Sequence, residues 1–520
     1  MRFLPLSAAT LAVALVLAGC AGEPAPAPTT EPVTGGNLTI AWNAQPTTLD
    51  PIATTATTTR DIANNIFEGL FALDADANPQ PMLASGYEVN DDFTVYTITL
   101  REGVLFHNGD EMTSADVVAS LQRWITTSSI GKQDYANVTV EADGDYAVTL
   151  TSPEPFYTMI QLMMPPNQGL IIVPEESVAA VTDTGMPEEA IIGTGPYALA
   201  GWTKDQSITL ERFDDYQGVE GEPSGLAGAK NAYLDTLTFE FVPDVTTRVN
   251  GLQTGEYDFA SAVPADNLAQ LESAGLTMST EFIYQFLFVP NKATGFFSSE
   301  EARQALYNAI DPTAILTSAY GGAEFFELNG ALSRPTQTNW YSEAGIDGRY
   351  DALDADKAKQ MFEDAGYDGS PIKILTTRDY PDSYNGSVVI EQQLKEAGLN
   401  AELVVVDQAT VLTMRAETTG WDLFPTALGF GAPDTFLPAK STWPGSTNSP
   451  EIADALAAIK LSTSDEEAFA AREALQTAFY DYGAALKVGD AATLNGMSAD
   501  LTGYTYLYGP IFFNMSKTGE

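Results

Sequence analysis

The sequence predicts an α/β protein built from more than one domain, and three observations support this prediction. The chain has 520 residues, more than a single hydrophobic core usually organises. Hydrophobic residues make up 44% of it, so the chain should fold rather than stay disordered. From about residue 246 onward, helical stretches that end at glycine alternate with strand-like runs, as in folds where helices cover sheets.

These repeating units share one local order: a helix, a glycine that can adopt the left-handed cap, and a strand. The predicted helices cover residues 246–254, 357–365 and 388–397, and the glycines after them are Gly255, Gly366 and Gly398. A further helix is predicted after Ser298, because Ser298 and Glu301 have the spacing of a capping box.

The N-terminus predicts export and lipid attachment. Arg2 precedes an uncharged, largely apolar run over residues 3–17, which has the length of a signal-peptide core and is short for a membrane-spanning helix. The run ends in Leu-Ala-Gly-Cys, which resembles the bacterial lipobox. Residues 1–20 are therefore predicted to be a lipoprotein signal peptide, with Cys20 lipidated; a simple secretory signal with an incidental cysteine is the alternative. Cys20 is the only cysteine, so the chain cannot form an internal disulfide.

Residues 21–36, AGEPAPAPTTEPVTGG, are predicted to be a tether rich in proline and threonine. In a polyproline-type conformation such a segment would reach roughly 50 Å, at about 3.1 Å per residue. The folded body is therefore expected outside the cytoplasm, anchored by lipid to the outer face of the cell membrane. In a cell with an outer membrane this is the periplasmic side.

A compact β-β-α unit is predicted between residues 81 and 124. Residues 87–89 and 93–100 are rich in β-branched and aromatic side chains and flank the polar turn at 90–92, so they predict a β-hairpin. Thr113 lies three residues before Asp116, the spacing of a capping box, and an apolar stripe at helical spacing follows.

Several strings in and around this unit resemble the signature of one family, the extracellular solute-binding proteins of family 5. Those proteins are the peptide- and nickel-type receptors of ABC importers. The strings are LDP at 49–51, IFEGL at 66–70, LREGV at 100–104, FHNG at 106–109, SADV at 114–117, GTGPY at 193–197 and EEARQALYNAID at 300–311.

The resemblance implies a two-lobed periplasmic-binding-protein fold of type II, in the large variant whose first lobe carries an extra subdomain. Two hinge strands would join the lobes, near residues 286–291 and 485–490. Lobe 1 would then comprise residues 37–287 and 488–520, and lobe 2 residues 288–487.

The composition argues against several kinds of function. Lys and Arg total 24 against 70 Asp and Glu, a formal charge of −46, so the chain lacks the basic surface that nucleic acids require. One histidine and one cysteine provide neither a nucleophile with its base nor a set of metal ligands, so no catalytic residue, metal or cofactor is expected. His107 lies in a turn where relatives also have Phe-His-x-Gly, and a structural role is favoured for it.

The resemblance also suggests where a ligand would bind. In peptide-binding relatives, an aspartate that pairs with the ligand's α-amino group stands five residues before the aspartate of a Gly-x-Pro-Asp-x-Phe-like run. The matching run is residues 431–436, which places Gly429 at that position. Asp434, Asp422 or a backbone carbonyl could take over the missing role.

Other candidates come from residue type and position. Arg378 falls within one residue of where a dipeptide-binding relative places an arginine for the ligand's carboxylate, and a surface arginine is the alternative. Thr55 and Thr57 lie in the loop that lines the cleft in relatives. The aromatic candidates for a pocket wall, each with core packing as the alternative, are Trp340, Tyr380, Trp421 and Trp443.

The function expected from the resemblance is a receptor that closes two lobes on a peptide or peptide-like solute and presents it to ABC permease subunits. It is expected to be a monomer and not an enzyme. The first alternative keeps this role for a non-peptide solute: an oligosaccharide, an opine-like conjugate or a metal chelate. An extracellular hydrolase is the second alternative.

Overall fold

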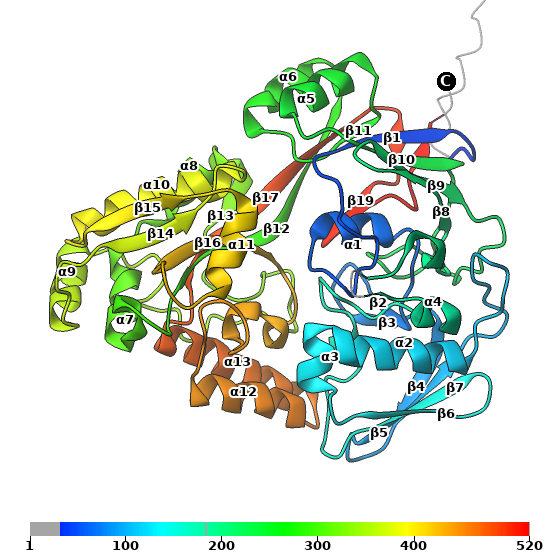
Figure 1. The fold of residues 1–520 in the computed structure, drawn as a ribbon, viewed down its shortest axis with the longest axis horizontal. Coiled ribbons are helices and arrows are strands. Elements are labelled where there is room, and N and C mark those ends of the chain that lie inside the picture. The colour runs from blue at the N-terminus through cyan, green and yellow to red at the C-terminus, as the bar shows by residue number, and fades with distance from the viewer. Residues whose placement is uncertain (1–31, 183–184, 519–520) are drawn as a thin grey trace, which may run out of the picture.

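The computed structural model describes residues 32–182 and 185–518, and it shows two lobes joined by a shared sheet (Figure 1). The signal peptide, Cys20 and residues 21–31 of the tether lie outside the described residues, so the predictions for them stay predictions. Within those ranges, none of the helices combines the length and the hydropathy that a bilayer crossing needs.

An 11-stranded mixed sheet runs through both lobes. Its order starts in lobe 2 with β15 (Ala401–Val405), β14 (Ile372–Thr376) and β16 (Leu423–Gly429), and continues with β12 (Thr277–Pro290) and β17 (Leu486–Met497). It ends in lobe 1 with β11 (Phe259–Ala260), β1 (Asn37–Trp42), β10 (Thr236–Phe241), β9 (Ser207–Arg212) and β8 (Tyr197–Thr203), while β13 (Phe326–Glu327) pairs with β17.

The two long strands β12 and β17 connect the lobes, and Figure 1 shows them running side by side from one to the other. They are antiparallel, from Thr277 opposite Met497 to Phe288 opposite Leu486. Residues 284–290 of β12 also pair with β16 of lobe 2, whereas Met497 of β17 pairs with β11 of lobe 1. The segments 286–291 and 485–490, expected as crossings, lie at the lobe 2 end of this strand pair.

The predicted β-β-α unit is confirmed and forms part of a separate four-stranded sheet in lobe 1. Strands β4 (Ala84–Val89) and β5 (Val95–Leu100) form the hairpin, and β7 (Ala147–Thr151) and β6 (Thr139–Ala142) extend it. Helix α2 (Ser114–Thr127) begins after Thr113, whose capping box with Asp116 is present. The apolar stripe of α2 buries Val117, Leu121 and Trp124 in the core of lobe 1.

The remaining elements complete the two lobes. Lobe 1 contains α1 (Thr57–Ala63), α3 (Ser129–Asp134), α4 (Glu175–Ala179), α5 (Val245–Thr254) and α6 (Leu268–Ser273), with the pairs β2 (Phe71–Leu73) and β3 (Pro79–Pro81), β18 (Leu501–Thr502) and β21 (Ser516–Lys517), and β19 (Thr505–Leu507) and β20 (Gly509–Ile511). Lobe 2 contains α7 (Glu300–Ala309), α8 (Pro312–Tyr320), α9 (Ala355–Asp364), α10 (Pro381–Glu396), α11 (Gln408–Ala416), α12 (Pro450–Leu461) and α13 (Asp465–Tyr482).

Two large hydrophobic clusters form the cores of the lobes. One gathers buried residues between Leu38 and Phe259 together with the C-terminal segment from Met497 to Met515. The other gathers buried residues from Phe286 to Val488. This separation supports the two-lobed fold, because each lobe has an apolar interior of its own.

One local prediction was wrong by a residue. The N-cap of α7 is Ser299, whose side chain accepts from the Ala302 amide, rather than Ser298. The Ser298 hydroxyl instead donates to the carbonyl of Gly295 in the preceding turn. Two serines in a row offer the same capping chemistry, so sequence spacing alone could not choose between them.

Candidate binding site between the lobes

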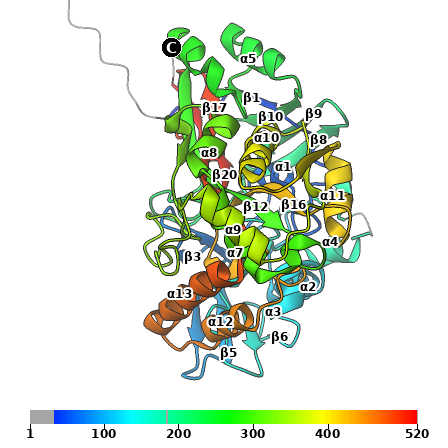
Figure 2. The same ribbon diagram turned by 90° about the vertical axis from the view of Figure 1, so that its left-hand side faces the viewer.

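The two lobes contact each other along one rim through α12 and α13, which lie beside the four-stranded sheet at the base of the molecule (Figure 2). The amide of Tyr157 donates to the carbonyl of Lys460 at 2.9 Å, and the Lys460 ammonium donates to the carbonyl of Asp134 at 3.0 Å. Arg472 of α13 donates to the side-chain oxygen of Gln161 at 3.1 Å. These contacts cross from lobe 2 to lobe 1, so the lobes are closed at this rim.

A second interlobe contact lies elsewhere on the molecule. Trp340 and Ala432 of lobe 2 pack with Ala77 of lobe 1 in a small buried cluster. Beside it, the Asn339 side-chain amide donates to the Asn78 side-chain oxygen at 2.9 Å.

Lobe 1 contributes a charged pair from α1 to the space between the lobes. The guanidinium of Arg60 contacts the Asp61 carboxylate at 2.7 Å and also donates to the Pro166 carbonyl at 3.4 Å. Burial raises the pKa of Asp61 to about 6. An added Cβ at Gly509 would lie 2.1 Å from the Asp61 carboxylate, so only glycine permits this close approach of β20.

Lobe 2 faces this pair with the end of β16, which pairs there with the hinge strand β12. Gly429, the last residue of β16, is opposite Tyr284 of β12. An added Cβ at Gly429 would lie 3.8 Å from the ring of Pro166 in lobe 1, and one at Gly431 only 3.1 Å from it. The loop that follows β16 therefore comes close to lobe 1 where glycine leaves room.

Six tyrosines surround this space and are called the tyrosine cluster: Tyr284, Tyr320, Tyr380, Tyr504, Tyr506 and Tyr508. Each keeps part of its side chain exposed, and yet the surrounding protein raises the pKa of every one, that of Tyr284 to about 12. These side chains are largely surrounded by protein, but water still reaches them. Side chains in such a position line a recess. The cluster therefore lies in a partly enclosed region to which both lobes contribute side chains, beside the cavity described next.

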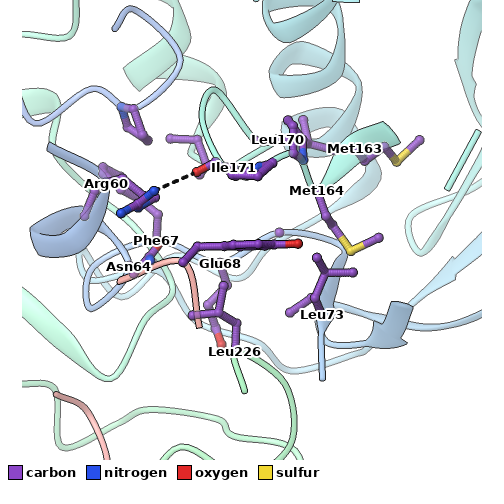
Figure 3. A pocket seen from close by; sticks show the side chains of 18 of the residues that line it. Arg60, Asn64, Phe67, Glu68, Leu73, Met163, Met164, Leu170, Ile171 and Leu226 are labelled. Carbon is purple, nitrogen blue, oxygen red and sulfur yellow. Dashed lines mark hydrogen bonds between the residues drawn. The ribbon is translucent and has the colours of Figure 1, made fainter. Parts of the chain in front are cut away.

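A cavity of about 110 Å³ adjoins the recess on the lobe 1 side. Figure 3 shows its largely apolar wall, formed by Phe67, Leu73, Met163, Met164, Leu170, Ile171 and Leu226, with Arg60 at one side. Tyr508 also lines it and has a left-handed backbone, φ 62°, and a buried hydroxyl without a hydrogen-bond partner. The thioether and aliphatic lining suits an apolar group of a ligand.

Four of the sequence candidates lie at or near the contact between the lobes. Gly429 and Tyr380 border the recess, and Trp340 belongs to the second interlobe cluster. Asp434 is buried and forms an ion pair with Arg472, the residue that reaches Gln161 of lobe 1.

The other candidates lie in different surroundings. Arg378 is exposed and stacks on Tyr384, whose hydroxyl it contacts at 2.8 Å. Trp421 is buried in the core of lobe 2 against Phe424, the packing role that the sequence analysis left open. Thr55 is exposed, and Thr57 is the first residue of α1.

His107 is held by backbone groups. Its Nδ1 accepts from the Gly193 amide at 3.2 Å, and its Nε2 lies 2.9 Å from the Gly195 carbonyl. Burial lowers its pKa, so the ring is neutral and the Nε2 proton is donated to Gly195. This arrangement ties the signature segment to the GTGPY turn and leaves neither nitrogen for catalysis. Within residues 32–182 and 185–518 no three His, Cys, Asp or Glu side chains gather as a metal site would require.

Sequence reasoning missed Arg60, Asp61 and most of the tyrosine cluster. One signal was available: Tyr504, Tyr506 and Tyr508 alternate along the string YTYLY, and alternate residues of a strand point to the same side. Arg60 and Tyr284 offered no such signal, because they come together only when the hinge strands bring the lobes into contact.

Two lobes with separate cores, a pair of strands between them and a recess lined from both sides define a two-lobed binding protein. The chain belongs to the bacterial extracellular solute-binding proteins, family 5, because residues 78–449 match the sequence model for the middle of that family. The resemblance seen in the signature segment is thereby confirmed.

Similar proteins agree with this assignment. The chain is 30% identical over 513 residues to the probable peptide ABC transporter periplasmic-binding protein y4tO of Sinorhizobium fredii, covering 90% of this chain and 91% of that one. It is 28% identical to the glutathione-binding protein GsiB of Salmonella typhimurium, over 71% of this chain and 70% of the other. The solved structure of the binding protein AgaA from A. tumefaciens R10 with agropinic acid superposes with a TM-score of 0.79 at 24% identity, over 93% and 99% of the two chains.

Proposed function

We propose that this protein is the receptor subunit of an ABC importer and captures a peptide or peptide-like solute in the recess between its lobes. The observation that carries the proposal is the recess itself, which Arg60 and Asp61 border from lobe 1, Tyr380 from lobe 2 and Tyr284 from the hinge strand β12. The names of y4tO and GsiB, which describe peptide and glutathione binding, support a solute of this class.

The proposed mechanism is closure of the two lobes about β12 and β17. A solute that contacts both walls stabilises the closed arrangement over the open one, and only this difference in affinity drives closure. We place the lobe boundaries at 287/288 and 487/488, within these two strands. Candidate contacts from sequence that fit this mechanism are Gly429 and Tyr380, which border the recess.

A non-peptide solute is the second candidate, and one observation favours it. Gly429, which carries no side chain, occupies the place where the resemblance puts the aspartate for a peptide's amino group, and Asp434 is already paired with Arg472. The complex of AgaA with agropinic acid shows that this fold also accommodates a solute of another kind.

We further propose that the chain binds without catalysing a reaction. His107 has both ring nitrogens occupied by backbone groups. A hydrolase would convert its ligand repeatedly, whereas a receptor holds it in a fixed stoichiometry and gains thermal stability from it.

Mass spectrometry of the solute that co-purifies with the native protein tests the proposal directly. We expect a peptide or peptide-like molecule in equimolar amount, released unchanged on unfolding. A sugar or other non-peptide solute would favour the second candidate, and a ligand recovered as cleavage products would contradict the receptor role.

We also propose that a lipid on Cys20 anchors a monomeric body to the outer face of the cell membrane, through the tether over residues 21–36. Cys20→Ala should release the protein from membranes into the soluble fraction. Membrane association that persists in this variant would contradict the anchor.

A further inference from the structure

Asp382 stands out among the acidic side chains near the recess. It is the second residue of α10 and only half-buried. Its carboxylate accepts a hydrogen bond from the Tyr320 hydroxyl at 3.1 Å. Among the residues that the structure describes, no Lys, Arg or His forms an ion pair with it.

The other recessed carboxylates all have a cation. In the described part of the chain five acids are buried, and each is ion-paired: Asp50 with Arg123, Asp61 with Arg60, Glu68 with Lys230, Asp434 with Arg472, and Asp490 with Lys487. Burial also raises the pKa of Asp134, Glu281 and Asp422, and each has a Lys or Arg close enough to counteract this rise. Burial raises the pKa of Asp382 as well, and only the Tyr320 hydroxyl and backbone amides counteract this rise.

The groups around Asp382 are suited to a cation. Tyr320 contacts its carboxylate, and Asp382 also acts electrostatically on Tyr284 and Tyr380. Tyr284 in turn lies within electrostatic reach of the Arg60–Asp61 pair across the recess. Because that pair is neutral as a whole, Asp382 leaves the recess with a negative charge bordered by aromatic rings. Such surroundings attract an ammonium or guanidinium group through both charge and ring faces.

We infer that Asp382 forms the cation-binding part of the recess and receives an ammonium or guanidinium group of the solute, beside the rings of Tyr284, Tyr320 and Tyr380. The inference rests on the proposed receptor function and narrows its ligand to solutes that carry such a group. The inference also explains why Asp382 has no cation of the protein beside it, although protein partly surrounds its carboxylate. Burial of an unpaired carboxylate is costly unless a partner arrives.

The probe is a peptide mixture made by digesting casein with elastase, and half of this mixture is acetylated on every amine. The two halves are combined and added to the solute-free full chain. Acetylated peptides without arginine or histidine carry no cationic group, so they serve as matched neutral competitors. We expect the wild type to retain peptides with a free amine or an arginine at least about tenfold over these competitors, the loss expected when a charged partner is removed. Asp382→Asn should abolish the preference, and Asp382→Glu should retain part of it.

Asp379→Asn is the control, because Asp379 is exposed, lies next to Tyr380 and carries the same charge. It should keep the preference. If the wild type retains neutral peptides as well as cationic ones, the inference about Asp382 fails while the peptide proposal stands.

If the wild type retains no peptide, the peptide proposal fails, and the co-purifying solute then decides the inference. A solute without a cationic group overturns it. A cationic solute that Asp382→Asn no longer retains supports it. Melting temperatures of all variants establish that loss of binding does not reflect loss of folding.

Discussion

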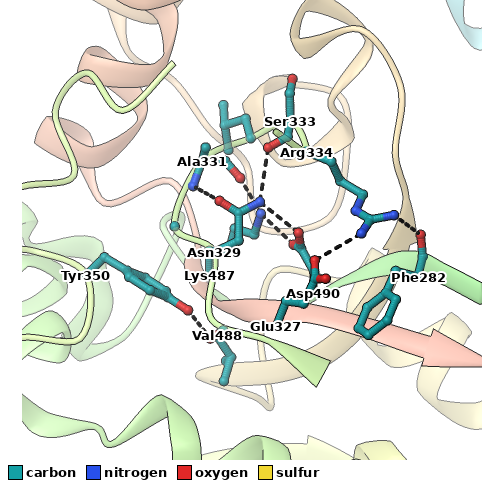
Figure 4. A network of polar contacts seen from close by, with 12 residues as sticks. Phe282, Glu327, Asn329, Ala331, Ser333, Arg334, Tyr350, Lys487, Val488 and Asp490 are labelled. Atoms are coloured by element: carbon teal, nitrogen blue, oxygen red, sulfur yellow. Dashed lines mark hydrogen bonds and ion pairs between the residues drawn. The ribbon is translucent and has the colours of Figure 1, made fainter. Parts of the chain in front are cut away.

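The hinge and the recess each enclose an acidic side chain, Asp490 and Asp382, but only the acid at the hinge is paired with a cation of the protein. At the hinge, Asp490 of β17 is fully buried, and it contacts the Lys487 ammonium at 2.9 Å and the Asn329 side-chain amide at 2.7 Å (Figure 4). In the recess, Asp382 has the Tyr320 hydroxyl and backbone amides but no cation. The protein itself thus supplies a cation to the hinge carboxylate. The recess carboxylate would obtain one only from a bound solute.

The hinge network reaches the loop that faces lobe 1. The Lys487 ammonium lies 5.6 Å from the ring of Phe430, and the guanidinium of Arg334 lies 5.8 Å from the same ring. Phe430 stands between Gly429 and Gly431, the residues that approach Pro166. The network therefore supports the loop through Lys487 and Arg334, the two cations that lie beside the Phe430 ring.

The largest expected effect is at the hinge. Asp490→Ala should lower the free energy of unfolding by about 3–5 kcal/mol, because it leaves the Lys487 ammonium buried without a counter-charge. Calorimetric melting of the solute-free protein measures the change as a fall in its melting temperature.

Glu327→Gln is the matched control at the same network. Glu327 pairs with Arg334, but its side chain is 45% exposed. Its substitution should therefore cost less than about 1 kcal/mol. Equal losses from the two variants would mean that burial does not set the strength of this network.

The second effect concerns closure rather than stability. Gly431→Ala should weaken solute binding about tenfold, because its Cβ would meet the Thr435 hydroxyl of its own loop at 2.7 Å and the ring of Pro166 in the other lobe at 3.1 Å. Gly429→Ala serves for comparison: its Cβ would lie at an ordinary 3.8 Å from Pro166, so any loss of binding there would come from the recess that Gly429 borders and not from a clash between the lobes. Titration calorimetry with the solute recovered from the native protein measures both. If the two variants bind alike, the lobes do not close in the arrangement described here.

The same contrast explains what the sequence could predict. The hairpin, the capped helix at Thr113 and the two-lobed fold depend on local patterns and on strings that resemble a family, and these are confirmed. The walls of the recess depend on residues far apart in the chain, such as Asp61, Tyr284 and Asp382. Residue type alone was also ambiguous: Trp421 packs in a core and Asp434 pairs with Arg472, although both were plausible ligand contacts.

A further effect, at most about 3 kcal/mol, is expected from pH at the lobe 1 wall. The pKa of Asp61 is raised from 3.8 to about 6. The folded protein therefore keeps this proton at pH values where the unfolded chain has released it, so folding loses stability as the pH rises from about 4 to about 6. Asp61→Asn removes that loss, although it leaves Arg60 without its partner at every pH.

The measurement is the melting temperature of wild type and Asp61→Asn between pH 4.5 and 7. The melting temperature of the variant should rise relative to that of the wild type as the pH increases. A constant difference across this range would show that Asp61 does not change its protonation there.

The smallest expected effect is the most informative for the comparison. Asp382→Asn should change the free energy of unfolding by less than about 1 kcal/mol, and in the direction of greater stability at pH 7. An acidic residue in the first turn of a helix normally stabilises it, which would give the opposite sign. Here burial outweighs that effect, because the pKa of Asp382 is raised in spite of its place at the start of α10. Calorimetric melting of the solute-free variant decides between the two signs. A fall in melting temperature comparable to that of Asp490→Ala would make Asp382 part of the structural frame, whereas a small rise together with lost binding would mark a carboxylate kept for its ligand.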